Sequence, residues 1–242
     1  MKNNIKPYEK DNTSKKEQVA KMFDNIAARY DFLNHFLSLG IDIIWRKIAV
    51  KEIAKVKPKI ILDVATGTGD LAIEISTIKP KKIIGIDISN NMLNIGRKKM
   101  IKKSLDHLID MQYGDSESLN FNNNTFDAIT AGFGVRNFEN LDKGLKEIYR
   151  VMKVGGKVAI LEPSEPKIFP FKQFYGLYFK IILPLLGKLF SKDNSAYKYL
   201  PNSVVEFPSR EAFLKELEKA GFKNCKFKPL TFGVAALYTA SK

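Results

Sequence analysis

Cysteine is almost absent from this chain, which has 242 residues and one cysteine, Cys225. A single thiol cannot form an internal disulfide framework, and it cannot supply a four-cysteine zinc site or a three-cysteine iron–sulfur cluster. We therefore expect no metal site of these kinds, and the cysteine usage is typical of a protein in the reducing cytoplasm.

Long hydrophobic runs are missing as well. The most apolar stretch, Phe174 to Phe190, is interrupted by two lysines, a proline and two glycines, and it is too short to cross a membrane as a helix. It suits a segment that lies on a membrane surface or forms a lid. Residues 1–16 are polar and lysine-rich and lack the apolar core of a signal peptide, so they are predicted to form a flexible basic arm.

Acidic residues are outnumbered by basic residues, 26 to 40, which gives a net charge of +14. This excess favours an anionic partner, such as nucleic acid, a lipid surface or an acidic substrate. The lysines are dispersed, however, and dispersed lysine indicates a nucleic-acid site less strongly than an arginine and aromatic cluster does. Solvated faces in a lysine-biased proteome are the simpler interpretation. The lysines are Lys51, Lys55, Lys57, Lys59, Lys79, Lys81, Lys82, Lys98, Lys99, Lys102 and Lys103.

Short apolar runs alternate with helical patterns in most of the chain. This rhythm predicts an α/β fold, doubly wound around a mostly parallel seven-stranded sheet. The strands are predicted at residues 59–64, 82–86, 108–113, 126–133, 157–161, 224–229 and 234–240, the last two as a hairpin at the sheet edge. Helices are predicted at residues 17–29, 43–56, 70–78, 90–102, 140–152 and 209–220.

The alternation breaks between Glu162 and Pro208, where aromatic residues and prolines are frequent. Residues 163–208 are predicted to form an inserted helical cap over the site. Residues 17–58, before the first strand, are predicted to form helices that cover substrate and cofactor. The predicted organisation is therefore one domain over residues 17–242.

A glycine-rich turn, Leu62–Asp70, joins the first strand to the helix that follows it. Its glycines, Gly67 and Gly69, let the backbone approach a ligand closely, and the helix offers free N–H groups. The turn departs from the dinucleotide pattern G-x-G-x-x-G. It has an acidic residue at each end, Asp63 and Asp70, which suits a ligand with an ammonium group and no pyrophosphate.

Acidic side chains also follow the next two strands. Asp87 ends the second strand, where a carboxylate can accept hydrogen bonds from both hydroxyls of a ribose. A nicotinamide cofactor would use the same contact, so Asp87 indicates a nucleoside without choosing among nucleosides. Asp115 and Ser116 end the third strand, where a side chain can bind the adenine amino group. A plain turn residue is the alternative for Asp115.

Several blocks of the chain match one enzyme family in order, from about Lys16 to the C-terminus. The matching residues are Tyr30-Asp31, Asn34, Ser38-Leu39-Gly40, Trp45-Arg46, Leu62–Asp70, Asp87-Ile88-Ser89, Met92-Leu93, Phe133-Gly134-Val135-Arg136-Asn137, Ser195, Tyr197 and Tyr199-Leu200. On these residues the chain resembles the menaquinone/ubiquinone C-methyltransferases, within the Rossmann-like class I methyltransferases. His35 departs from the family pattern, because an acid often follows Asn34.

The resemblance implies the cofactor S-adenosylmethionine and a polyprenyl quinol as substrate. The expected reaction is methylation of a ring carbon, with demethylmenaquinol converted to menaquinol. Methylation of 2-methoxy-6-polyprenyl-benzoquinol in ubiquinone synthesis, or of another small molecule, is the alternative. Thr68, Asp87, Asp115 and Ser116 are implied to contact the cofactor. The full set of expected cofactor residues adds Asp63, Gly67, Gly69, Asp70, Ile88 and Met92.

Methyl transfer to a ring carbon sets requirements for the catalytic groups. The carbon must approach the methyl group in line, at about 3 Å. It becomes a good nucleophile when a neighbouring hydroxyl loses its proton, so the site needs a base and donors that hold the phenolate. Arg136 and Asn137 are candidates for stabilising the oxygen. Tyr30, Asp31 and His35 are the other catalytic candidates, with a merely packed or exposed histidine as the alternative for His35.

The polyprenyl tail needs an apolar path. Residues 169–190 are predicted to form its wall and to contact the inner, cytoplasmic membrane peripherally, with lysines 172, 180 and 188 facing anionic headgroups. A cap helix that packs on the sheet is the alternative. The oligomeric state stays open.

A nucleic-acid methyltransferase fits the charge but not the motifs. Amino-group methylases usually carry Asn/Asp-Pro-Pro-aromatic after the fourth strand, where this chain has Ala131-Gly132-Phe133-Gly134. Cytosine-C5 methylases need a cysteine nucleophile, and Cys225 lies in the wrong place. We therefore expect no nucleic-acid partner. A non-catalytic cofactor-binding protein and a nicotinamide dehydrogenase are further alternatives.

Overall fold

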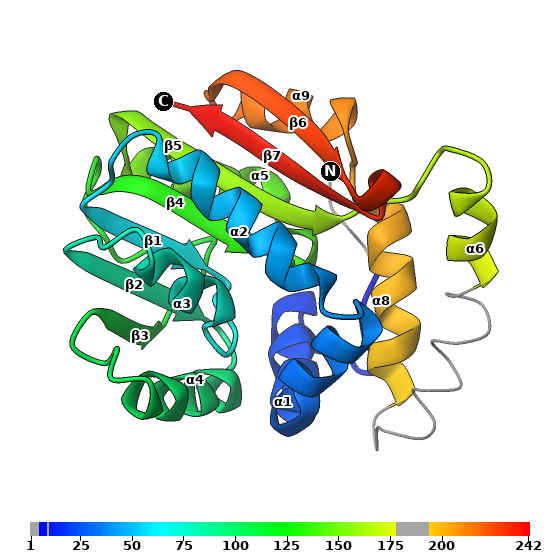
Figure 1. The fold of residues 1–242 in the computed structure, drawn as a ribbon. Coiled ribbons are helices and arrows are strands. Elements are labelled where there is room, and N and C mark those ends of the chain that lie inside the picture. Colours follow the sequence, from blue (N-terminus) through cyan, green and yellow to red (C-terminus); the bar gives the residue numbers. More distant parts are fainter. Residues whose placement is uncertain (1–4, 9, 178–193) are drawn as a thin grey trace.

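The computed structural model describes residues 5–8, 10–177 and 194–242. Its centre is a seven-stranded sheet in the order β3-β2-β1-β4-β5-β7-β6 (Figure 1). The first five strands in this order pair in parallel, and β7 runs antiparallel to both β5 and β6. The predicted doubly wound, mostly parallel α/β fold with an edge hairpin is confirmed. The strands are β1 (Ile60–Val64), β2 (Lys82–Asp87), β3 (Ile109–Tyr113), β4 (Phe126–Gly132), β5 (Met152–Pro163), β6 (Lys223–Leu230) and β7 (Ala235–Ser241).

Helices cover both faces of the sheet. One face packs against α2 (Ile41–Ala54), α3 (Asp70–Ser76) and α4 (Asn90–Lys102), and the other against α5 (Leu141–Val151) and α9 (Glu211–Lys219). Shorter or peripheral elements are the 3₁₀ turns η1 (Val135–Asn137) and η3 (Thr231–Gly233), and the helices α6 (Phe171–Leu177) and α8 (Asn194–Glu206). Within these described residues, no helix has the length and apolarity needed to span a membrane.

The strand order reverses next to β1. Because β1 pairs with β2 on one side and with β4 on the other, the connections that leave these strands diverge to opposite faces of the sheet. Such a reversal opens a crevice outside the carboxyl ends of the strands, where open α/β sheets bind their ligands. The topology therefore points to the ends of β1, β2 and β4 as the place to look for a site.

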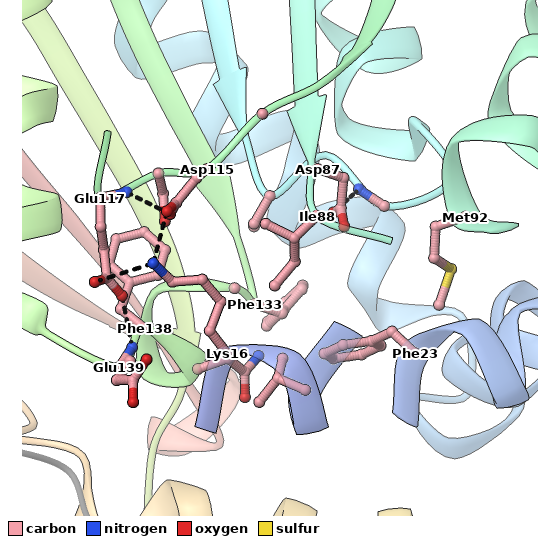
Figure 2. Close-up of a pocket in the computed structure, with 18 of the residues that line it drawn as sticks. Lys16, Phe23, Asp87, Ile88, Met92, Asp115, Glu117, Phe133, Phe138 and Glu139 are labelled. Atoms are coloured by element: carbon pink, nitrogen blue, oxygen red, sulfur yellow. Dashed lines mark hydrogen bonds and ion pairs between the residues drawn. The ribbon is translucent and has the colours of Figure 1, made fainter. Parts of the chain in front are cut away.

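Helix α1 (Lys15–Leu37) lies across this edge of the sheet. It begins with a capping box, in which Ser14 accepts from the amide of Glu17, and the Glu17 carboxylate accepts from the amide of Ser14. The helix therefore starts two residues before the predicted position, and it continues well beyond residue 29. Figure 2 shows Lys16 and Phe23 of α1 facing the ends of the strands.

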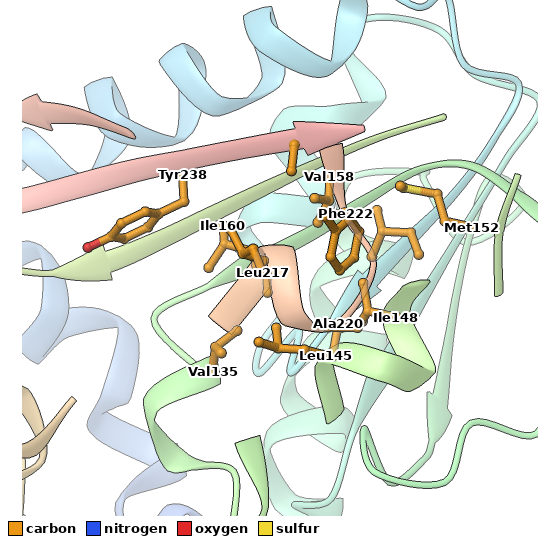
Figure 3. Packing of buried hydrophobic residues seen from close by; sticks show 14 of the residues in the cluster. Val135, Leu145, Ile148, Met152, Val158, Ile160, Leu217, Ala220, Phe222 and Tyr238 are labelled. Carbon is orange, nitrogen blue, oxygen red and sulfur yellow. The ribbon is translucent and has the colours of Figure 1, made fainter. Parts of the chain in front are cut away.

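The larger apolar core fixes the position of the segment that follows β4. Val158 and Ile160 of β5 pack with Leu145 of α5 and Leu217 of α9, and Val135 of η1 joins the same buried cluster (Figure 3). Burial of each such side chain contributes roughly 1.5–3 kcal/mol. The core therefore anchors η1, and with it the segment Phe133–Asn137, at the carboxyl edge of β4.

One strand begins earlier than predicted, and part of the predicted cap is described. Strand β5 begins at Met152, five residues earlier than predicted, because Met152 already pairs with Phe126 before an irregularity in the register. Helix α6 lies in the first part of the predicted cap, and helix α8 lies in its last part. Residues 178–193 of the cap, with lysines 180 and 188, lie outside the described residues.

Candidate functional site

A cavity lies at the carboxyl ends of β1, β2 and β4, beneath α1. Its empty space, with the open mouth included, is about 650 Å³. Its walls are apolar at the centre and acidic at two points. The lining residues are Lys16, Val19, Phe23, Tyr30, Ala65, Gly67, Asp87, Ile88, Met92, Gly114, Asp115, Ser116, Glu117, Gly132, Phe133, Gly134, Asn137, Phe138 and Glu139.

The turn after β1 forms one wall of the cavity. Gly67 has a φ of +58° and Gly69 a φ of +85°, a conformation that favours glycine. A Cβ atom on Gly67 would find only the Tyr30 ring within 4 Å, at 3.9 Å. The backbone at Gly67 is thus bare toward the cavity, and a ligand can approach it closely.

A buried carboxylate holds this turn in place. Asp63, at the end of β1, accepts hydrogen bonds of 2.6 Å from the hydroxyls of Thr66 and Thr130. Burial raises the pKa of Asp63 to about 6, although both hydroxyl bonds lower it. Asp63 does not line the cavity. Its two hydrogen bonds join the turn, through Thr66, to β4, through Thr130.

Asp87 lies at the end of β2 and does line the cavity (Figure 2). Its two oxygens accept from the amides of Gly67 and Ser89, each at 2.8 Å. Burial raises the pKa of Asp87 to about 6, although these amide bonds lower it. A carboxylate offers about four acceptor positions, so Asp87 can still accept from hydroxyl groups of a ligand.

The other acidic point is formed around Asp115. Lys16 of α1 lies 2.6 Å from Asp115 and 3.5 Å from Glu117, as the dashed lines in Figure 2 show. Glu117 in turn accepts from the amides of Glu139 and Asn140. This network closes the end of the cavity that lies beyond β3, and it includes a lysine that the sequence patterns did not single out.

Four of the predicted site residues meet outside the cavity, where α1 packs on α3 and α4. Lys99 pairs with Asp31, at 2.8 Å, and with Asp70, and the hydroxyl of Thr68 donates to Asp31. The imidazole of His35 lies 3.6 Å from the Asp70 carboxylate. None of Asp31, His35, Thr68 or Asp70 lines the cavity. They hold α1 against the start of α3.

The segment Phe133–Asn137 places two different side chains. Asn137 lines the cavity, and its Oδ1 accepts from the hydroxyl of Tyr199, at 3.1 Å. This bond leaves the amide N–H groups of Asn137 to act as donors. Arg136 points away from the cavity and is buried. Its guanidinium pairs with Glu162 at 3.0 Å and donates to Ser203 and to the Phe133 carbonyl.

The structure thus divides the predicted site residues into two groups. Gly67, Asp87, Ile88, Met92, Asp115, Ser116, Tyr30 and Asn137 line one cavity, whereas Asp63, Thr68, Gly69, Asp70, Asp31, His35 and Arg136 lie around it. The cavity also has lining residues that were not predicted: Lys16, Val19, Phe23, Ala65, Gly114, Gly132, Phe133, Gly134, Glu117, Phe138 and Glu139. Phe133 and Gly134 belong to a segment that the sequence did mark, but Lys16, Phe138 and Glu139 carry no local signal.

The arrangement suits a nucleoside with a reactive group directed to an apolar chamber. Asp87 provides acceptors for hydroxyl groups, and Asp115 an acceptor for an amino group. The flat rings of Phe23 and Phe133 and the flexible side chain of Met92 offer apolar contacts in the same cavity. The bare backbone at Gly67 leaves space where a Cβ would project, so these residues fit S-adenosylmethionine.

Comparison with known proteins identifies close relatives. The model of the ubiE/COQ5 methyltransferase family matches residues 11–242. A Bacteroides fragilis protein named demethylmenaquinone methyltransferase is 52% identical over 239 residues, which cover 98% of this chain and 97% of that protein. A Geotalea daltonii protein named ubiquinone/menaquinone biosynthesis C-methyltransferase UbiE is 49% identical over 232 residues, which cover 95% of this chain and 98% of that protein.

Among solved structures, a SAM-dependent methyltransferase from Aquifex aeolicus matches with a TM-score of 0.54 and 20% identity. The match covers 75% of this chain and 81% of that one. At this identity the comparison shows the fold, which is that of the class I methyltransferases.

The raised pKa values of Asp63 and Asp87 predict how stability depends on pH. Each carboxyl titrates near 3.8 when exposed and at about 6 in the folded protein. The folded state therefore binds protons more tightly, and stability falls as pH rises from about 4 through 6. The difference corresponds to roughly 3 kcal/mol for each group. Urea unfolding of the ligand-free protein should give a larger free energy of unfolding at pH 5 than at pH 7.

Asp63→Asn is the control for this effect. The amide has the same shape: its oxygen can accept from one of the hydroxyls of Thr66 and Thr130, and the other hydroxyl can rotate to accept from its N–H. The variant should lose part of the pH dependence and be at least as stable as the wild type at pH 7. An unchanged slope between pH 5 and pH 7 would show that Asp63 does not titrate in this range.

Proposed function

This chain belongs to the ubiE/COQ5 methyltransferase family, and we propose that it methylates a ring carbon of a polyprenyl quinol with S-adenosylmethionine. The preferred substrate in this proposal is demethylmenaquinol, which becomes menaquinol. The observation that supports this choice most directly is the 52% identity, over nearly the full length of both chains, to the Bacteroides fragilis demethylmenaquinone methyltransferase. The benzoquinol of ubiquinone synthesis is the second candidate, because the Geotalea daltonii relative is named for both pathways.

The cavity provides the contacts that the cofactor needs. In this proposal Asp87 accepts from the ribose hydroxyls, while Asp115 and Ser116 meet the adenine, with Ile88 and Met92 against its faces. When bound, S-adenosylmethionine supplies an electrophilic methyl group. Asp63, Gly69, Asp70 and Thr68 contribute by holding the turn and the start of α3, as their positions around the cavity suggest.

Tyr30 and Asn137 are the polar groups best placed to hold the quinol oxygen. Both line the cavity, as does Phe133. Burial raises the pKa of Tyr30, so its hydroxyl stays protonated and can donate. The amide of Asn137 is oriented by Tyr199 so that its N–H groups can donate as well. Two donors would stabilise the oxygen as it loses its proton, which makes the adjacent ring carbon electron-rich.

In this proposal Arg136 acts on the substrate indirectly, because it does not line the cavity. Burial raises the pKa of Tyr30 and of Tyr199, and the charge of the buried Arg136 guanidinium offsets part of that rise. A fixed positive charge in a buried site favours negative charge on the neighbouring oxygens. Glu162 and Ser203 hold the guanidinium in place. We therefore treat Arg136 as a positioning and electrostatic residue.

Quinol methylation by the purified protein tests the proposal. Demethylmenaquinol with a short tail, kept reduced by dithionite, should gain one methyl group with S-adenosylmethionine, as mass spectrometry of the extracted quinone would show. The oxidised quinone should not react, because it has no hydroxyl to ionise. As a control, Asp87→Ala should raise the KM for S-adenosylmethionine at least tenfold. Absence of product from both the naphthoquinol and the benzoquinol would refute the proposed substrate class.

The Arg136–Glu162 pair separates a catalytic contribution from a structural one. Arg136→Met alone leaves Glu162 buried without its partner, at a cost of about 3–5 kcal/mol, so both Tm and kcat should fall. Adding Glu162→Gln removes the unpaired charge and keeps acceptors for the amides of Val135 and Arg136. The double variant should regain most of the Tm but not the kcat. Recovery of both would mean that Arg136 only supports the fold.

The substrate tail leads us to propose peripheral contact with the cytoplasmic membrane. Leu39, between α1 and α2, is 84% exposed, and Ile44 and Phe232 are also largely exposed. A hydrogen bond of 2.8 Å from Trp45 to Thr231 brings the segment that contains Ile44 close to the segment that contains Phe232. In a flotation assay with phosphatidylglycerol vesicles, a larger fraction of the wild type than of the double variant Leu39→Ser/Ile44→Ser should float with the vesicles. Equal flotation of the two proteins would remove this surface from the proposal.

A further inference from the structure

Two turns at the amino-terminal edge of the sheet repeat the same sequence. Lys57-Pro58-Lys59 precedes β1, and Lys79-Pro80-Lys81 precedes β2. Both turns follow a helix, α2 in the first case and α3 in the second. The neighbouring strands β1 and β2 are parallel, with Ile60 opposite Lys82. The two turns therefore lie side by side.

The backbone of the two turns is equivalent. The amide of Lys57 donates to the carbonyl of Ala54, the last residue of α2, and the amide of Lys79 donates to Ser76, the last residue of α3, each at 3.0 Å. Lys57 has a φ of +48° and Lys79 a φ of +53°. The amide of Lys81 then donates to the carbonyl of Lys59, at 2.8 Å, and joins the two turns.

A pocket of about 630 Å³, its open mouth included, lies between these turns. Its residues come in two matching sets, one from each turn, and four of them are lysines. The lining residues are Ala54, Lys57, Pro58 and Lys59 from the first turn and Ile78, Lys79, Pro80 and Lys81 from the second. The prolines restrict both turns, so the pocket exists before any ligand binds.

The positive charge of this pocket is not neutralised by the protein. Across residues 5–8, 10–177 and 194–242, no ion pair involves any of the four lysines. Glu52 pairs with Lys55 and Lys157, and Asp127 with Lys153. The carboxyl-terminal ends of α2 and α3 each add a partial charge of about −0.5. Four ammonium groups against these two partial charges leave an excess of about three positive charges.

The backbone of both turns places a lysine in a left-handed conformation shortly after a helix. The residue that follows a helix in a left-handed conformation is usually glycine and sometimes asparagine, because a Cβ is unfavourable there. Both turns nevertheless carry a lysine at this position. Cations near a helix end are favourable in general, but neighbouring positions would provide that effect without the backbone cost. All four lysines line the pocket and are exposed to solvent.

We propose that this pocket binds a phosphate group. Four flexible ammonium donors in a preformed pocket match the charge and the several acceptor oxygens of phosphate. The connections from α2 to β1 and from α3 to β2 lie at the edge of the sheet opposite to the carboxyl ends of the strands (Figure 1). The pocket lies between these connections and so on the opposite edge from the cofactor cavity. Its ligand is therefore separate from the methyl donor and from the quinol. The phosphate can belong to a free anion or to a lipid headgroup.

Calorimetric titration of the full chain with inorganic phosphate and with pyrophosphate tests this site, with sodium chloride at equal ionic strength as the reference. The test variant is Lys57→Gly/Lys79→Gly, which removes two charges and places glycine where φ is positive, so folding should be preserved. The control is Lys98→Gln/Lys102→Gln, which removes the same charge from exposed positions of α4. We expect the Kd for pyrophosphate to rise at least tenfold in the test variant and less than twofold in the control.

Vesicle sedimentation distinguishes the two sources of phosphate. If the ligand is a headgroup, the wild type should bind phosphatidylglycerol vesicles, the test variant should bind them at least tenfold more weakly, and free phosphate should show little binding. If it is a free anion, only the calorimetric difference should appear. No binding in either arm, or equal weakening in test variant and control, would overturn the proposal. S-adenosylmethionine affinity should stay unchanged in both variants, so failure here is separable from failure of the methyl-transfer proposal.

Discussion

Two buried carboxylates at the ends of neighbouring parallel strands determine the shape of the candidate site. Asp63 binds the hydroxyls of Thr66 and Thr130, and Asp87 binds the amides of Gly67 and Ser89. Burial disfavours their charged forms, and the hydrogen bonds offset part of that cost. The turn after β1 keeps its shape because its Thr66 hydroxyl and its Gly67 amide donate to these carboxylates. Asp87 has acceptor capacity left and faces the cavity, where hydroxyl donors from a ligand would be most stabilising.

Helix α1 forms the other half of the site by a different kind of interaction. Two of its residues form ion pairs, Lys16 with Asp115 and Asp31 with Lys99, and both pairs are partly exposed to solvent. Such pairs each contribute about 0–1 kcal/mol. A buried apolar cluster of Val19, Met22, Leu33 and Tyr199 does more to hold α1 in place. The cavity is therefore closed by one helix that packs through apolar contacts and is aligned by charges.

The charged network also explains why the catalytic candidates divide as they do. Asp31 and Arg136 belong to motifs that mark the family, and His35 lies in the same block as Asp31, yet each is engaged with other protein groups outside the cavity. Their sequence neighbours Tyr30 and Asn137 reach the cavity instead. In a helix or a 3₁₀ turn, adjacent residues point in different directions, so a motif can mark a place without showing which of its side chains faces the ligand.

The sequence by itself determined the order of strands and helices, the sharp turn after β1 and the acid at the end of β2, because these follow from hydrophobic periodicity, glycine and residues adjacent in the chain. Only the tertiary structure decided that Lys16 meets Asp115, that Glu162 holds Arg136, and that two lysine turns share one pocket. Those contacts join segments far apart in sequence. Their partners depend on strand order and on how α1 crosses the sheet edge, which no local pattern encodes.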